Sequence, residues 1–101
     1  MDPRVAAILS AVKKYKPEKV ILFGSHARGT SDRHSDIDLV IIKRTRKRFL
    51  DRIKEVLAII RPNFAIDILV YSPQEFKNML AAGNAFLEFI VKDGTVIYEK
   101  S

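Results

Sequence analysis

Cysteine is absent from this sequence of 101 residues. The chain therefore has no disulfide bond, no thiol nucleophile and no cysteine-ligated zinc, which is compatible with a reducing cytoplasm. No apolar run approaches the roughly 20 residues that a membrane-spanning helix needs. The N-terminal residues 1–4 are not followed by the long apolar stretch of a signal peptide. These absences predict a soluble protein that stays in the cytoplasm.

The sequence also lacks the length for a second, substrate-binding domain. Because 48% of its residues are hydrophobic, we expect one globular domain that spans residues 1–101. Basic residues outnumber acidic ones, with 18 Lys and Arg against 12 Asp and Glu and a net charge of +6. A basic domain tends to meet nucleic acid, nucleotides or an acidic partner, although the charge could also serve solubility alone.

Hydrophobic periodicity divides the chain into helices and strands. Helices are expected at residues 3–16, 45–60, 72–82 and 85–91, and strands at 20–23, 37–42, 64–71 and 95–98. Pro3 and Pro73 suit first helical positions, and Thr45 is a candidate helix cap. The polar stretch 24–35 is expected to be a loop. This order predicts an α/β (α+β) fold, in which helices pack on a small mixed β-sheet.

Three aspartates interrupt segments that are otherwise apolar. Asp36 and Asp38 flank Ile37 at the start of an expected strand, where alternation points both carboxylates to one face. Asp67 interrupts the expected strand 64–71. A buried carboxylate is costly unless it is paired, protonated or bound to metal. Since Mg²⁺ takes oxygen ligands from carboxylates and from phosphates, the three aspartates predict a site for a pair of Mg²⁺ ions.

Each aspartate also has a simpler interpretation. Asp36 could cap a turn or helix, Asp38 could pair with a nearby arginine, and Asp67 could lie on the solvated face of an edge strand. These alternatives weaken when the three residues are considered together with the segment that precedes them.

A candidate phosphate-binding turn, Gly24–Ser25, follows directly on the expected strand 20–23. Glycine lets a phosphate approach the backbone, and free N–H groups in such a turn bind anions. The Ser25 hydroxyl adds a donor, and the Arg28 guanidinium could reach the same phosphates. Gly-Ser alone is usually an ordinary turn. The order strand, Gly-Ser, loop, Asp-x-Asp, strand is more specific, because it sets a phosphate site beside a metal site.

The stretch from Phe23 to Thr30, continued by residues 35–39, resembles the signature of the polymerase-β-type nucleotidyltransferase superfamily. It is most similar to the minimal nucleotidyltransferase (MNT) branch, and to the antitoxins of HEPN–MNT toxin–antitoxin pairs. The likeness covers nearly the whole chain, because Asp67 lies where the family has its third carboxylate. His26 stands where many relatives carry arginine or another long side chain, and we assign it no role.

The resemblance implies a polymerase-β-like core, a reaction and a role for each site residue. Gly24 and Ser25 would bind the phosphates of the NTP. Asp36 and Asp38 would bind two Mg²⁺ ions, and Asp67 would complete the metal site and help deprotonate the acceptor hydroxyl. The implied reaction moves a nucleoside monophosphate, AMP from ATP, to a hydroxyl acceptor on a HEPN-type toxin.

Two further segments are candidate docking surfaces. The basic run Lys43–Arg48 could hold triphosphate, RNA or an acidic partner, or could simply be a solvated helix face. Its positive charge would oppose the dipole of the expected helix start. The segment Ala85–Val91 is apolar nearly all round, which fits either core on two sides or an interface with a second chain.

Three hypotheses follow for the function. The first is an active nucleotidyltransferase, and the second is an antitoxin that neutralises its partner by contact and carries a vestigial site. The third, a basic nucleic-acid-binding domain, lacks the aromatic platforms expected for stacking on single strands. The aspartate set favours the first, because a protein that only binds has no physical need for clustered carboxylates.

Overall fold

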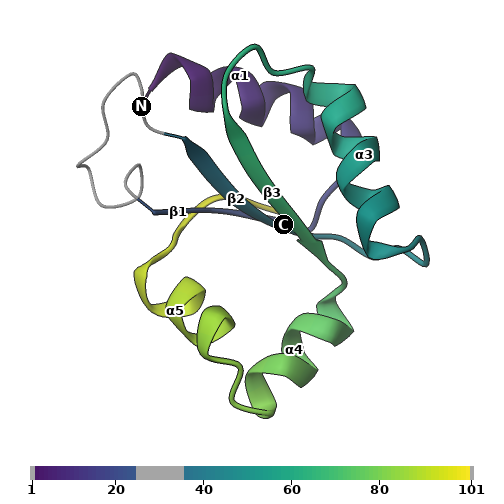
Figure 1. Cartoon of the computed structure of the whole chain (residues 1–101), viewed down its shortest axis with the longest axis vertical. Coiled ribbons are helices and arrows are strands. Elements are labelled where there is room, and N and C mark those ends of the chain that lie inside the picture. The colour runs from purple at the N-terminus through teal and green to yellow at the C-terminus, as the bar shows by residue number, and fades with distance from the viewer. Residues whose placement is uncertain (1, 25–35, 101) are drawn as a thin grey trace.

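The computed structural model describes residues 2–24 and 36–100. Within them the strands are β1 (Lys19–Phe23), β2 (Ile37–Ile42), β3 (Ile66–Tyr71) and β4 (Thr95–Glu99). They form one mixed sheet in the order β3-β2-β1-β4 (Figure 1). β1 runs antiparallel to β2 and β4, whereas β2 and β3 are parallel. The structure confirms the predicted fold class, a small mixed sheet with helices packed on it.

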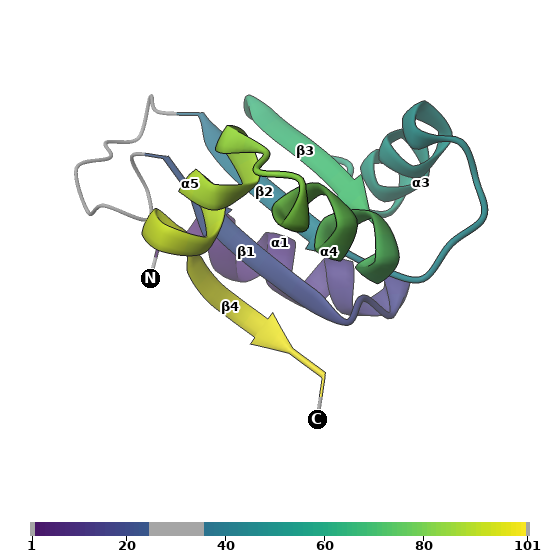
Figure 2. The same cartoon turned by 90° about the horizontal axis from the view of Figure 1, so that it is seen from below.

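The helices lie on both faces of the sheet (Figures 1 and 2). They are α1 (Pro3–Val12), continued by the 3₁₀ turn η1 (Lys13–Tyr15), then α3 (Phe49–Ile60), α4 (Pro73–Ala81) and α5 (Ala85–Asp93). α1 and α3 contact each other on one face, and α4 and α5 contact each other on the opposite face. No helix in the described part of the chain is long and apolar enough to cross a membrane.

Proline begins two of these helices, as the sequence predicts, and a polar side chain caps each of them. The Asp2 side chain accepts a hydrogen bond of 2.8 Å from the Arg4 N–H, and Pro3 is the first residue of α1. Ser72 and Glu75 form a reciprocal capping box around the start of α4. Such caps satisfy backbone N–H groups that have no partner inside the helix.

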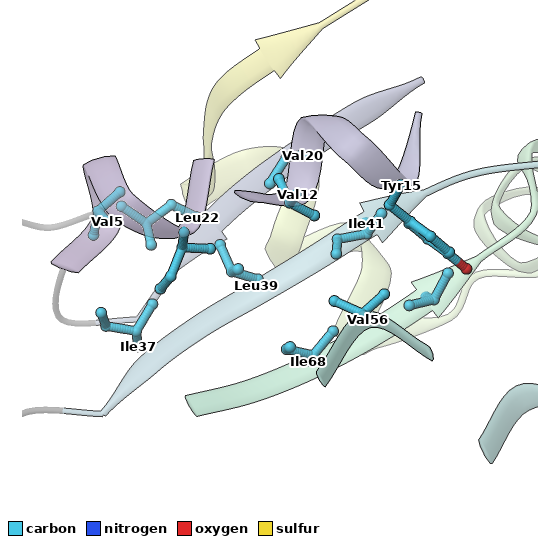
Figure 3. Packing of buried hydrophobic residues seen from close by; sticks show 12 residues of the cluster. Val5, Val12, Tyr15, Val20, Leu22, Ile37, Leu39, Ile41, Val56 and Ile68 are labelled. Atoms are coloured by element: carbon cyan, nitrogen blue, oxygen red, sulfur yellow. The ribbon is translucent and has the colours of Figure 1, made fainter. Parts of the chain in front are cut away.

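The main core lies between the sheet and the pair α1 and α3 (Figure 3). Alternate residues of β2, namely Ile37, Leu39 and Ile41, point into this core and are fully buried. The intervening residues of β2 therefore face α4 and α5, where Val40 and Ile42 form a smaller core with Ile90 of α5. Asp38 shares that second face, and this sets the position of the candidate site.

The basic run precedes α3 instead of forming its first turns. α3 begins at Phe49, so the expectation that Thr45 caps this helix is wrong. The Thr45 hydroxyl accepts a hydrogen bond of 3.1 Å from the Lys47 N–H and closes a local turn instead. The apolar face of the helix begins only at Phe49, and the preceding run Lys43–Arg48 has no apolar side chain that could pack a helix onto the sheet. Most of the positive charge therefore lies in a loop, where it does not oppose the helix dipole.

A buried arginine joins three elements at one end of the sheet. The Arg52 side chain of α3 donates hydrogen bonds to the Lys47 carbonyl at 2.8 Å and to the Val70 carbonyl at 3.2 Å. It also donates to both carboxylate oxygens of Glu75, at 2.7 and 3.3 Å. These hydrogen bonds fix the start of α3 and the end of β3 to the capping box of α4.

Candidate active site

Two of the predicted aspartates lie side by side on neighbouring strands. Asp38 of β2 is in register with Asp67 of β3, and it is paired on its other side with Phe23, the last residue of β1. Residues in register on adjacent strands point to the same face of a sheet. The row Phe23–Asp38–Asp67 therefore runs across three strands, on the face that α4 and α5 partly cover. We call it the carboxylate row.

Gly24 lies against the carboxylate of Asp38. Its φ angle is +74°, in the left-handed region that side chains disfavour. A Cβ atom at this position would lie only 2.4 Å from Oδ2 of Asp38. The sequence predicts that glycine here leaves room for a phosphate. The structure shows that the same glycine also gives room to one of the predicted metal-ligating carboxylates.

The three aspartates differ in their surroundings. Asp38 is half-buried between the fully buried Ile37 and Leu39, while Asp67 is exposed on the edge strand β3. Asp36 is exposed and lies one residue before β2, outside the paired register. The structure thus brings Asp38 and Asp67 together by strand pairing, and it leaves Asp36 at the solvent-facing start of the same strand.

The donor set suits a hard cation that also binds substrate oxygens. Within residues 2–24 and 36–100, no three His, Cys, Asp or Glu side chains are gathered closely enough to hold a metal by themselves. A pair of in-register carboxylates offers part of an oxygen ligand set and leaves positions open. Mg²⁺ is commonly bound by one or two carboxylates together with substrate phosphates and water. The residues present therefore fit a metal that arrives with its nucleotide.

Three residues named from the sequence fall outside the described part of the chain. They are Ser25 and Arg28, the expected phosphate ligands beside Gly24, and His26, to which no role is assigned.

An aromatic contact borders the carboxylate row and was not anticipated from the sequence. The rings of Phe23 and Phe86 of α5 meet edge to face, with centroids 5.6 Å apart and an interplanar angle of 81°. Phe86 retains 37% of its surface exposed. The sequence signal was the phenylalanine that ends β1 directly before Gly24, but only the packing of α5 shows which ring it meets.

The basic run Lys43–Arg48 lies at the other end of the sheet. It follows Ile42, which at about 3.3 Å per residue is roughly 13 Å along β2 from Asp38. The Lys43 ammonium donates a hydrogen bond of 2.6 Å to the Tyr15 carbonyl and lies 4.5 Å from the centre of the Tyr15 ring. This position argues against a role in holding the triphosphate at the carboxylate row.

Solved structures share this arrangement of strands and helices. A structure described as a "putative nucleotidyltransferase" from Sulfolobus solfataricus matches 96% of this chain and 87% of its own, with a TM-score of 0.56 and 23% identity. A structure of a toxin–antitoxin with AMP-PNP matches 95% of this chain and 73% of its own, with a TM-score of 0.60 and 18% identity. At these identities the likeness establishes the fold.

Sequence comparison identifies the family. The Methanocaldococcus jannaschii protein named "Putative protein adenylyltransferase MJ0141" is 35% identical over 72 residues, which are 71% of this chain and 72% of that protein. The family described as "Polymerase beta, Nucleotidyltransferase" matches residues 6–101, a range that contains Gly24 and all three aspartates. With the fold and the carboxylate row agreeing, this chain belongs to the polymerase β nucleotidyltransferase family.

Proposed function

We propose that this chain transfers AMP from ATP to a hydroxyl group of a partner protein, in a Mg²⁺-dependent reaction. One observation carries the proposal: Asp38 and Asp67 are in register on one face of the sheet, directly beside Gly24. Two neighbouring carboxylates offer oxygen ligands to Mg²⁺, and a nucleotide triphosphate brings this ion with it. Membership of a nucleotidyltransferase family supports this kind of reaction.

Asp38 and Asp67 would hold the metal ions, with Asp36 as a further ligand from the start of β2. When bound, a pair of Mg²⁺ ions neutralises the charge on the phosphates and orients the attacking and leaving oxygens. Gly24 would let the triphosphate come close to the backbone. Ser25 and Arg28, outside the described residues, would complete the phosphate site.

Asp67 is the residue that we assign to the acceptor side. It is exposed on the edge strand, so an incoming hydroxyl can reach it without displacing core residues. The hydroxyl oxygen would bond to the α-phosphorus while the bond to the β-phosphate oxygen breaks and pyrophosphate leaves. The proton of the hydroxyl would pass to the Asp67 carboxylate, which acts as a general base.

A partner protein is the acceptor that best fits this chain. The described residues form one sheet with four helices and leave the carboxylate row open on the side of Asp67. Positioning supplies much of the rate in phosphoryl-type transfer, and an acceptor docked at this open side would have its nucleophile positioned at Asp67. The M. jannaschii relative is named as a protein adenylyltransferase, and one fold relative is a toxin–antitoxin. We therefore propose an antitoxin role, with a HEPN-type toxin as partner.

The test uses the protein encoded by the neighbouring reading frame as acceptor. This protein is incubated with the purified chain, ATP and Mg²⁺, and its intact mass is measured. Mass increases in multiples of an adenylyl group, absent with Asp38→Asn and without Mg²⁺, would support the proposal. Lys54→Asn serves as a matched control, because Lys54 is exposed on α3, on the opposite face of the sheet.

Neutralisation by contact is the second candidate function. The observation in its favour is the exposed apolar surface of α5, where Phe86, Phe89 and Val91 retain 37%, 36% and 59% of their surface. If the double variant Asp36→Asn/Asp38→Asn neutralises the partner in cells as well as the original chain does, and no adduct forms, the binding hypothesis is correct and the catalytic one is not.

A further inference from the structure

Two aromatic rings, Phe23 and Phe86, lie at one end of the carboxylate row. Phe23 is the cross-strand neighbour of Asp38 and the chain neighbour of Gly24. Phe86 packs on Phe23 from α5, which lies over the end of β1 on the same face of the sheet (Figure 2). A nucleotide whose phosphates reach Gly24 and Asp38 would therefore have these rings beside it.

Phe86 is not among the fully buried side chains of α5. Leu87 and Ile90 make the buried contacts of this helix, with 0% and 1% of their surface exposed. Phe86 is 37% exposed, and Phe89, three residues further along the helix, is 36% exposed. An edge-to-face contact covers at most one face of a ring. Phe86 thus has aromatic surface available next to the carboxylate row.

We propose that the base of the nucleotide stacks on the ring of Phe86, which acts as a platform and is held in place by its edge-to-face contact with Phe23. This inference rests on the proposed function, because it takes the nucleotide to be bound at Gly24 and Asp38. Stacking of a base on an aromatic side chain tolerates every base, since each has a π face. A phenyl ring has no hydrogen-bonding group with which to choose among bases.

The proposal has a consequence for base preference. Purines have the larger π surface, so the contribution of Phe86 is greater for ATP and GTP than for CTP and UTP. It is similar for ATP and GTP, because their ring systems have the same size. Inorganic tripolyphosphate has no base, so Phe86 contributes nothing to its binding.

Phe49 provides a matched control on the same chain. It is also a phenylalanine with 37% of its surface exposed, and it also contacts an aromatic ring, that of Tyr71 at 5.7 Å. Tyr71 is the last residue of β3, at the end of the sheet opposite to Asp67. Phe49→Leu therefore reproduces the loss of a half-exposed ring away from the carboxylate row.

The experiment measures the affinity of the whole chain for ATP and for tripolyphosphate, both with Mg²⁺, by calorimetry. The variants are Phe86→Leu, which keeps an apolar contact with Phe23, Phe86→Tyr, which keeps the ring, and Phe49→Leu. We expect Phe86→Leu to weaken ATP binding about fivefold or more. Tripolyphosphate binding should stay within about twofold, and Phe86→Tyr and Phe49→Leu should bind ATP like the original chain.

Other results would overturn the platform. Unchanged ATP binding by Phe86→Leu would leave the proposed function standing and show that this ring serves another contact, such as a protein partner. An equal loss of ATP and tripolyphosphate binding would show that Phe86 only supports the fold around the site. If the original chain binds neither ligand, the proposed function fails and the platform fails with it.

Discussion

The close approach of Gly24 to Asp38 predicts how much stability is lost when a methyl group is added at Gly24, because that group would meet the Asp38 carboxylate. In Gly24→Ala the new Cβ would lie 2.4 Å from Oδ2 of Asp38, at a φ angle of +74°. A left-handed backbone costs a non-glycine residue roughly 1–2 kcal/mol. Turning the Asp38 carboxylate away adds about 0.5–1.5 kcal/mol if it leaves its preferred rotamer. We expect a total loss of about 2–3 kcal/mol.

Gly83→Ala separates the two contributions. Gly83 has nearly the same φ angle, +79°, but the nearest atom to its added Cβ is Oε1 of Glu88 at 3.8 Å, an ordinary contact. This variant should therefore lose only the backbone contribution, about 1–2 kcal/mol. Both substitutions restrict the unfolded chain in the same way, so that effect cancels in the comparison.

The assay is urea unfolding followed by circular dichroism, combined with a double-mutant cycle. In an Asp38→Ala background, Gly24→Ala should cost no more than Gly83→Ala, which gives a coupling of about 1 kcal/mol between Gly24 and Asp38. Gly24→Ala should also weaken binding of ATP with Mg²⁺, whereas Gly83→Ala should not. Equal costs for Gly24→Ala and Gly83→Ala, with normal nucleotide binding in both, would refute the reasoning.

Three further predictions follow from the structure. Asp67→Asn should hold or raise the melting temperature of the metal-free chain and abolish transfer, because it removes one of two neighbouring like charges; a large loss of stability in a thermal scan would instead indicate a structural role for Asp67. Arg52→Met should lower the free energy of unfolding in urea by about 2–3 kcal/mol, since it breaks charged hydrogen bonds to Val70 and Glu75, while exposed Lys54→Met should stay within about 0.5 kcal/mol. Burial raises the pKa of Tyr15 from 10.0 to about 12. The phenol ionises near pH 10 in the unfolded chain but stays neutral to about pH 12 in the folded chain. Its contribution to the free energy of unfolding is therefore fully present below pH 10 and is lost as the pH rises to about 12. Tyr15→Phe should lose less of its free energy of unfolding over that range in a pH titration, and an alkaline transition identical to that of the original chain would count against this.

The strands and the fold class were predictable because local patterns determine them. The alternation in β2, with Asp38 between buried Ile37 and Leu39, indicates both a strand and the face on which Asp38 lies. Ser72 followed by Pro73 is a local sequence signal for the start of α4, because serine caps helices and proline suits the first helical position. In each case the signal lies within a few residues of the feature that it predicts.

Other features depend on contacts between distant segments, so the sequence could not reveal them. Thr45 has the chemistry of a helix cap, but the helix begins where its apolar face first meets the sheet, at Phe49. The guanidinium of Arg52 meets Glu75 only because α3 and α4 start at the same end of the sheet. The exact pairing of Asp38 with Asp67 likewise depends on the register of β2 and β3, although the resemblance to the family indicated that both belong to one site.

Calorimetric titration of the chain with ATP tests the central claim, a metal-dependent nucleotide site at Asp38 and Asp67, most directly. The account predicts that ATP binds in the presence of Mg²⁺, that binding is much weaker in EDTA, and that Asp38→Asn removes the dependence on Mg²⁺ while circular dichroism shows an intact fold. The triphosphate contacts the carboxylates only through the metal, so the affinity for ATP must increase with the concentration of Mg²⁺. Equal affinity for ATP with Mg²⁺ and with EDTA would contradict the account.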